Sequence, residues 1–463
     1  MSARRRHWAL RALVLLCLVL LCLVGQAASA LAQPVATQQT SPGGLSFRHV
    51  LMPEDTHQAL VFAWKDGTAI ALPGKEALAA LAPALMMEGP KGSTRSAMLE
   101  DLRDLQAGIG MSAGVNFAQG QLLAPVAKFA TAAGILARLL ADPALPEDQL
   151  KEAQRNRALA SQQAAQNAET QAQRLLARLA LGQGPYLRLL TADPSIFERV
   201  TKADIEAWRR DVLVRDGLMI VAAGPLAAAE VGREIDRIFA GLPQSGNVPA
   251  VPKPVVRSSG KLVVLERPVV QTIISAGAPT GLAITPDIVR AELAIGVLGG
   301  GFSGRLLRAV RERLGATYGI SASLQPVDAY TRGLLIHTPV ANDKAKDALA
   351  TIRAEYARFW AEGVTEDEIE PLKTVFMTRN RDRLRRAPSV AGVLLGLSLQ
   401  GMPDDFLATY DARLRAYGRA AVNEEIRAKF PAAPLTFVMV APSAAGLGAD
   451  CVIKAPEEIA RCE

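Results

Sequence analysis

Hydrophobic and polar positions follow a strand-like pattern in some stretches of the chain and a helical period in others. Residues 59–67, ALVFAWKDG, have the pattern of a strand, and 96–105, SAMLEDLRDL, have helical spacing. Residues 147–181 are rich in Ala, Gln, Leu and Arg, which are good helix formers, so they predict one long helix. Two further stretches, 271–279 and 320–327, look like strands of a sheet that helices cover on one face.

The pattern repeats once along the chain. ALPEDQL recurs as GVTEDEI, LMIVAAGP recurs as LTFVMVAP, and LQAGIGMSA recurs as LGATYGISA, which aligns Gly110 with Gly319. Three matches in the same order and at nearly the same separation are hard to obtain by chance. The repeat predicts two homologous domains, at 45–241 and 261–450.

A proline-rich segment separates the two repeats. Residues 242–260, LPQSGNVPAVPKPVVRSSG, suit an extended linker and no core element. Within each half the expected order is strand, helix, strand pair, long helices, strand. Each domain is therefore expected to be α+β, with a mostly antiparallel sheet covered by helices.

The N-terminus has the composition of an export signal. Arginines at positions 4–6 precede the apolar run 12–24, and small residues follow it up to Ala32. We expect residues 1–32 to be a signal peptide that is cleaved near Ala32, which places the mature chain in the periplasm or outside the cell. An uncleaved N-terminal anchor is the alternative.

Removal of this leader changes the charge balance. Four of the 52 basic residues leave with it, which lowers the formal charge from +7 to +3. A surplus that small gives no reason to expect nucleic acid as a partner. After cleavage we expect no contact with the membrane either.

Two cysteines remain in the mature chain, both in its last segment, 451–463. In an oxidising compartment Cys451 and Cys462 are expected to pair and to staple this tail. Two unpaired thiols on a frayed tail are the alternative.

Residues for catalysis are scarce. His49, His57 and His337 are the mature histidines, and none lies three or four residues from another, which excludes a two-histidine metal site on one helix. The chain has no G-x-S-x-G motif and no mature cysteine outside its tail. The glycine loop Gly299, Gly300 and Gly301 is expected to form a turn between two helices, where backbone could approach another chain or a peptide.

The segment 298–323, LGGGFSGRLLRAVRERLGATYGISAS, resembles the C-terminal domain of insulinase-like, or pitrilysin, zinc metallopeptidases. That family has a glycine turn, a helix beginning around Ser-Arg-Leu, and an arginine and a tyrosine seven residues apart, the spacing of Arg311 and Tyr318. The resemblance extends over about residues 45–445. It implies that Arg311 and Tyr318 bind the substrate peptide across a chamber from the zinc. An arginine on a helix face and a tyrosine packed on the sheet are the alternative.

The same resemblance implies that the stretch 80–89, ALAPALMMEG, corresponds to the helix with the zinc motif H-x-x-E-H. Ala80 and Ala84 then stand at the two histidine positions, and Pro83 stands at the general base. The family's third ligand is a downstream glutamate, but 153–163 contain no carboxylate. Zinc hydrolysis needs three ligands and a base, so we expect no metal and no cofactor in this chain.

These features together predict a subunit that is inactive alone. We expect a non-catalytic subunit of a heteromeric periplasmic zinc metallopeptidase, which supplies the Arg–Tyr pair and half of the peptide chamber. Its partner in a heterodimer would be a homologous chain that carries the zinc. A structural or peptide-binding pseudo-peptidase without a proteolytic role is the alternative.

Overall fold

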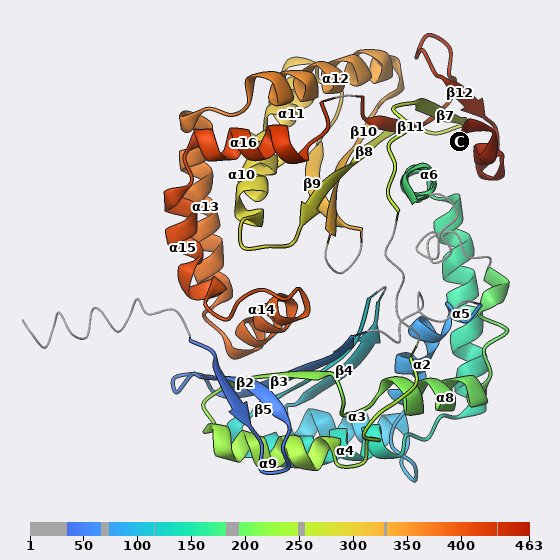
Figure 1. The fold of residues 1–463 in the computed structure, drawn as a ribbon. Helices are drawn as coiled ribbons and strands as arrows, with labels where there is room; N and C mark the ends of the chain where they lie inside the picture. Colours follow the sequence, from blue (N-terminus) through green and yellow to red (C-terminus); the bar gives the residue numbers. More distant parts are fainter. Residues whose placement is uncertain are drawn as a thin grey trace, which may run out of the picture.

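The structure is a computed structural model, which describes residues 35–65, 74–114, 116–181, 194–248, 255–327, 331–432 and 434–463. The expected signal peptide, 1–32, and the middle of the expected linker, 249–254, lie outside the described residues. Each half of the chain forms one mixed sheet with its own helices (Figure 1). The predicted α+β class with two domains is confirmed.

The first half contains, in chain order, β1 (Thr37–Thr40), β2 (Ser46–Leu51), β3 (His57–Lys65), α2 (Leu78–Met86), α3 (Arg95–Asp104), β4 (Gly108–Ala113), β5 (Phe117–Pro125), η1 (Val126–Lys128), α4 (Phe129–Ala141), α5 (Glu147–Gln166), α6 (Ala168–Leu181), η2 (Pro194–Ile196), α8 (Lys202–Val212), β6 (Leu218–Gly224) and α9 (Ala228–Phe239).

The second half contains β7 (Leu262–Glu266), β8 (Gln271–Ala283), α10 (Ile288–Gly299), η3 (Gly301–Ser303), α11 (Arg305–Leu307), η4 (Arg308–Arg313), β9 (Ser321–Pro326), β10 (Thr331–Ala341), η5 (Asn342–Lys344), α12 (Ala345–Glu362), α13 (Glu366–Arg383), α14 (Ala387–Leu399), α15 (Phe406–Ala416), α16 (Arg419–Lys429), β11 (Thr436–Ala441), β12 (Cys451–Ile453) and η6 (Pro456–Cys462).

The two sheets have the same strand order. The first runs β1-β2-β6-β3-β5-β4 and the second runs β12-β7-β11-β8-β10-β9. In each, one inner pair is parallel, β2 with β6 and β7 with β11, and the next three pairs are antiparallel. Only the outermost strand differs, because β1 is antiparallel to β2 whereas β12 is parallel to β7. The sequence repeat is therefore also a repeat of topology.

The two halves exchange one helix each. Helix α6 of the first half packs on β8 and β11 of the second sheet, and α14 of the second half packs on β3 and β6 of the first (Figure 1). Apolar residues of α6 share one core cluster with strands β7, β8 and β11. Because each sheet is covered on both faces, strands such as β11 are buried throughout instead of alternating.

This exchange explains one wrong prediction. The long helix expected over 147–181 is interrupted at Asn167, whose extended backbone (ψ 126°) ends α5 before α6 begins. The break lets α6 leave the direction of α5 and reach the second sheet. Composition alone does not reveal such a break, but Asn167 marks it locally, because its Oδ1 accepts from the backbone N–H of Thr170 at 2.9 Å and caps the start of α6.

Residues of the first half hold both ends of α14. The backbone N–H of Ala387, at the first residue of α14, donates to Asp55 Oδ2 at 2.8 Å. At the other end, Arg48 Nη1 donates to Ser398 Oγ at 2.7 Å, and Arg48 also pairs with Asp404. A carboxylate at a helix N-terminus satisfies a backbone donor and complements the helix dipole.

The C-terminal tail belongs to the second sheet. Cys451 lies in β12 and forms a disulfide with Cys462 in η6, where the two Cα atoms are 5.7 Å apart. The side chain of Lys261 donates to the carbonyl oxygens of Cys462 and Glu463 at 2.6 and 2.8 Å. In the part of the chain that the structure describes, no helix has the length and apolarity needed to cross a membrane.

Candidate functional site

Helix α2 carries the positions where a zinc motif was expected, and it is a core element. Pro83 lies inside the helix and is buried, while Ala80 and Ala84 are half-buried. Leu81 and Leu85, with 0% and 1% of their surface exposed, pack in the core of the first half. Proline lacks the N–H that would bond to the carbonyl four residues earlier, and a helix that must hold metal ligands rigidly would not tolerate that loss.

No other part of the described chain supplies a zinc site. Within the described ranges, no group of three His, Cys, Asp or Glu side chains is placed to hold a metal ion. His49 Nε2 lies 2.9 Å from the carbonyl oxygen of Leu226, and burial lowers the pKa of this histidine although that bond opposes the shift. His337 Nδ1 lies 2.9 Å from Ser275 Oγ on the neighbouring strand. His57 Nδ1 lies 2.9 Å from Thr56 Oγ1, so each of the three histidines has a structural hydrogen-bond partner.

The structure exposes the expected substrate-binding pair. Arg311 lies on the π-helical turn η4, and Tyr318 lies on the loop that precedes β9. The side chain of Tyr318 is 90% exposed, and that of Arg311 is exposed as well. Neither side chain makes a hydrogen bond or ion pair with another described residue. A tyrosine packed on the sheet, which was the alternative, is not what the structure shows.

The loop that carries Tyr318 is anchored on both sides of it. Thr317, 9% exposed, accepts a hydrogen bond from the backbone N–H of Gly319 at 3.1 Å. Thr338 on β10 donates to the carbonyl oxygen of Gly319 at 2.9 Å. Ile320, the next residue, is buried in the core. The backbone is thus fixed while the phenol projects into solvent, so its exposure does not come from a loose loop.

The glycine loop allows helix α10 to approach strand β9 closely. A Cβ atom on Gly299 would lie 2.6 Å from the backbone N of Ala322 on β9, and one on Gly300 would lie 2.6 Å from Gly296 Cα. Only Gly301, with φ of 78°, has open space around it and requires glycine for its backbone conformation. The expected turn between helices is present, and Gly299 serves the contact between α10 and β9.

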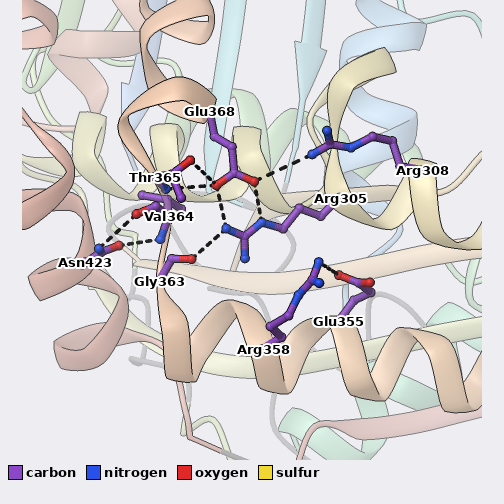
Figure 2. A network of polar contacts seen from close by, with 9 residues as sticks. All are labelled: Arg305, Arg308, Glu355, Arg358, Gly363, Val364, Thr365, Glu368 and Asn423. Carbon is purple, nitrogen blue, oxygen red and sulfur yellow. Dashed lines mark hydrogen bonds and ion pairs between the residues drawn. The ribbon is translucent and has the colours of Figure 1, made fainter.

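Close to this loop lies a buried arginine that the sequence analysis missed. Arg305, 6% exposed, holds Glu368 through two bonds, Nε to Oε1 at 2.7 Å and Nη2 to Oε2 at 2.6 Å (Figure 2). Its Nη2 also donates to the carbonyl oxygen of Gly363 at 2.8 Å. Glu368 closes a capping box with Thr365 at the start of α13. The capping-box pattern was visible in the sequence, but the arginine partner was not.

Hydrogen bonds and opposite charges stabilise this network around Arg305 and Glu368. Burial alone would raise the pKa of Glu368, but hydrogen bonds from Arg305 and from Thr365 outweigh it and lower the pKa to about 2. Gly363 has φ of 72°, and a Cβ there would lie 2.3 Å from Asn423 Oδ1. That oxygen accepts from the backbone N–H of Val364 at 2.7 Å (Figure 2). The contacts join α11, the turn before α13, and α16 into one rigid unit beside η4.

Comparison with known proteins agrees with this picture. The family described as "Peptidase M16 inactive domain" matches residues 199–376. A curated relative, the "non-peptidase homolog YmxG" of Helicobacter pylori, is 22% identical over 275 residues, which cover 57% of this chain and 62% of the relative. The chain thus matches less than two thirds of that protein.

Solved structures share the fold. The crystal structure of a peptidase M16 inactive domain from Pseudomonas fluorescens superposes with a TM-score of 0.81 at 20% identity, covering 89% of this chain and 98% of that one. The periplasmic protease PqqL from Escherichia coli superposes with a TM-score of 0.75 at 14% identity, covering 89% of this chain but 47% of that one. The predicted resemblance to insulinase-like peptidases without the zinc motif is confirmed.

Proposed function

We propose that this M16-like chain is the non-catalytic subunit of a periplasmic zinc metallopeptidase and supplies Arg311 and Tyr318 to the peptide chamber. The observation that carries the proposal is the contrast between these residues and α2. The zinc positions are filled by Ala80, Pro83 and Ala84, whereas Tyr318 is 90% exposed on an anchored loop. A chain that lacks the metal but presents such a pair is suited to complete the site of another chain.

The chemistry of the pair fits a peptide carbonyl. A phenol hydroxyl and a guanidinium both donate hydrogen bonds, and they stabilise the negative charge that develops on a carbonyl oxygen during hydrolysis. Because neither side chain is engaged with another described residue, neither must break a bond within the protein to bind substrate. Fixed donors of this kind contribute most to catalysis when their backbone is already held in place.

A zinc-bearing homologous partner would complete the chamber in a heterodimer. The chain covers 47% of the protease PqqL, so it corresponds in fold to about half of that protein. A separate homologous chain would supply the remaining half. Export to the periplasm rests on the composition of residues 1–32.

Reconstitution with the zinc-bearing chain tests the catalytic contribution. Tyr318→Phe keeps the ring and removes one donor, so turnover of the complex should fall by roughly 10²–10³. Arg311→Met should mainly weaken substrate binding, because a charged donor is lost. Zinc content and native mass of the complex should stay as in the wild type.

The matched control removes a hydroxyl elsewhere. Tyr417 donates to Asp287 at 2.7 Å, so Tyr417→Phe makes the same chemical change away from the proposed chamber. It should leave turnover within about twofold, which corresponds to less than ~0.5 kcal/mol of barrier. Wild-type turnover from both Tyr318→Phe and Arg311→Met would exclude the accessory role.

The similarity to a non-peptidase homolog favours a second candidate, a structural or peptide-binding pseudo-peptidase without proteolytic role. Purification of the native chain from its own host separates the two. Recovery with a zinc-bearing homologue supports the first candidate, and recovery in a complex that contains no such chain supports the second.

A further inference from the structure

A cavity of about 640 Å³ lies in the second half, between α10, α13, α14, α15 and β9. Its volume is within the range of sites for small ligands, about 300–1,000 Å³. It is distinct from the surface formed by Arg311 and Tyr318, which do not line it. Helix α14, which the two halves share, closes one side.

Most of the wall is apolar. The side chains that a ligand would meet come from four helices: Ile295 on α10, Phe376 on α13, Val393 and Leu397 on α14, and Phe406 on α15. These are large, branched or aromatic groups. They suit an apolar chain or side chain.

One part of the wall is polar and carries hydrogen-bond donors, of which one amide is buried and two guanidinium groups are exposed. Arg379, Asn380 and Arg383 come from α13, and Tyr410 comes from α15. Asn380 is 9% exposed, and its Nδ2 has no hydrogen-bond partner among the described residues. Neither arginine makes a hydrogen bond or ion pair with any described residue. A buried donor without a partner costs about 1–3 kcal/mol, so an acceptor in the cavity would be stabilised.

Glu292 on α10 is the acidic group of the cavity. Burial raises its pKa to about 7, although Arg383 and Arg332 oppose the shift. The other titratable groups around it are Tyr410 on α15 and, beyond it, Asp411. On α16, Glu425 is paired with Arg290 at 3.5 Å, and β9 has no titratable side chain. Near neutral pH Glu292 is therefore protonated part of the time, and it then donates a hydrogen bond as its neighbours do.

We propose that this cavity binds a carboxylate carried on an apolar chain, with the carboxylate beside Arg379, Arg383 and Asn380 and the apolar part against Phe376 and Leu397. The ligand is either the C-terminal residue of an apolar peptide or a free medium-chain carboxylic acid. All of its contacts lie within this chain, so the proposal needs no catalytic partner. The ligand proposal can therefore be wrong while the accessory role is right, and the accessory role can be wrong while the ligand proposal is right.

Calorimetric titration of the full mature chain distinguishes the two sources. The probes are octanoate, acetyl-Ala-Leu with a free carboxylate, and acetyl-Ala-Leu amide. At least one of the two acids should bind at a single site, ten times or more tighter than the amide, because the amide lacks the charge that the arginines hold. Tighter binding of octanoate indicates a free acid, and tighter binding of the dipeptide acid indicates a peptide end. Equal binding of acid and amide, or no binding of either acid, would overturn the proposal.

Two variants test the polar end. Arg383→Met should weaken acid binding at least tenfold, and Asn380→Leu should weaken it about tenfold. Asn380→Leu should leave the melting temperature unchanged or higher, because it removes an unpartnered buried donor. The control is Arg385→Met, since Arg385 pairs with Asp382 at 3.3 Å and does not line the cavity. Unchanged acid affinity in both test variants would contradict the placement of the carboxylate.

Glu292 gives an independent measurement. As the pH falls from 8 to 6, Glu292 takes up a proton, so the affinity for either acid should rise. Glu292→Gln imitates the protonated form and should bind the acid at pH 8 as tightly as the wild type does at pH 6. The affinity of this variant should change little between pH 8 and pH 6. A wild-type affinity that is constant over this range would contradict a carboxylate bound beside Glu292.

Discussion

Helices α2 and α5 of the first half and helices α10 and α13 of the second half occupy equivalent places in the repeat. In each half the first helix follows the long central strand and the second begins at a matching glutamate, Glu147 or Glu366. The contact between α2 and α5 is filled by apolar residues such as Leu81 and Leu150. Between α10 and α13 lies a cavity with Glu292 and unpartnered donors.

The two pairs of helices differ in how their N-termini are held. Helices α2 and α13 each contain one interior proline, Pro83 and Pro371, so a proline does not distinguish them. Helix α13 begins with a capping box that Arg305 clamps, whereas α5 begins at Pro146 without any side-chain cap. The start of α13 is thus held by polar contacts that the start of α5 lacks.

The largest expected effect concerns the hydrogen bonds of Arg305 to Glu368 at the start of α13, which we call the clamp. Arg305→Met leaves the half-buried Glu368 with Arg308 at 3.7 Å as its remaining cation, and it should lower the free energy of unfolding by about 3–4 kcal/mol, measured by urea denaturation at pH 7. In the first half, the matching position in the repeat is Gln149, whose side chain donates to its neighbour Asp148 at 3.4 Å. Gln149→Ala should cost less than about 0.5 kcal/mol.

The pH dependence of the clamp has a definite sign. The folded pKa of Glu368, about 2, lies below its ordinary value of 4.5, so its contribution is present above pH 4.5 and is lost as the pH falls toward 2. The difference in stability between wild type and Arg305→Met should therefore narrow below pH 4.5. A difference that stays constant down to pH 3 would show that the clamp acts by packing and not by charge.

The next effect tests whether α2 is only a core helix. Leu81→Ala removes a fully buried side chain and should cost about 3 kcal/mol of stability without affecting ligand binding in the cavity. In the second half, Asn380→Leu on α13 should have the opposite pattern, with stability kept and acid binding weakened. A small loss from Leu81→Ala would mean that the α2 surface is not packed as a core and would remove the contrast between the halves.

Local patterns in the sequence predicted those elements that local residues determine. The strand at 59–67 is β3, the helix at 96–105 is α3, and the repeated strands are β6 and β11, because their burial follows from their own apolar residues. The third repeated stretch contains β4 in the first half and the start of β9 in the second, with Gly110 inside β4 and Gly319 just before β9.

Contacts between distant residues could not be predicted in this way. The packing of α6 on the second sheet joins distant residues, and the partner of Glu368 lies in α11. The cavity combines α10 with α13 and α14, which no local pattern connects. The exposure of Tyr318 depends on Thr338, a residue of the next strand. Sequence periodicity indicates which face of an element is buried, and not which element covers it.

The smallest expected effect concerns the exchanged helices α6 and α14. It tests whether the polar contacts at these two helices contribute equally to stability. Asp55→Ala removes the acceptor at the N-terminus of α14 and should cost about 1 kcal/mol of unfolding free energy. Glu54→Ala, at an exposed neighbouring residue, is the control and should change the unfolding free energy little.

At the other exchanged helix, Arg178 of α6 pairs with Glu463 at 2.9 Å on a partly exposed surface, so Arg178→Met should cost only about 0.5 kcal/mol. Chemical denaturation of the three variants checks the order. A larger loss from Arg178→Met than from Asp55→Ala would show that the tail contact, and not the helix cap, is the stronger of the two ties between the halves.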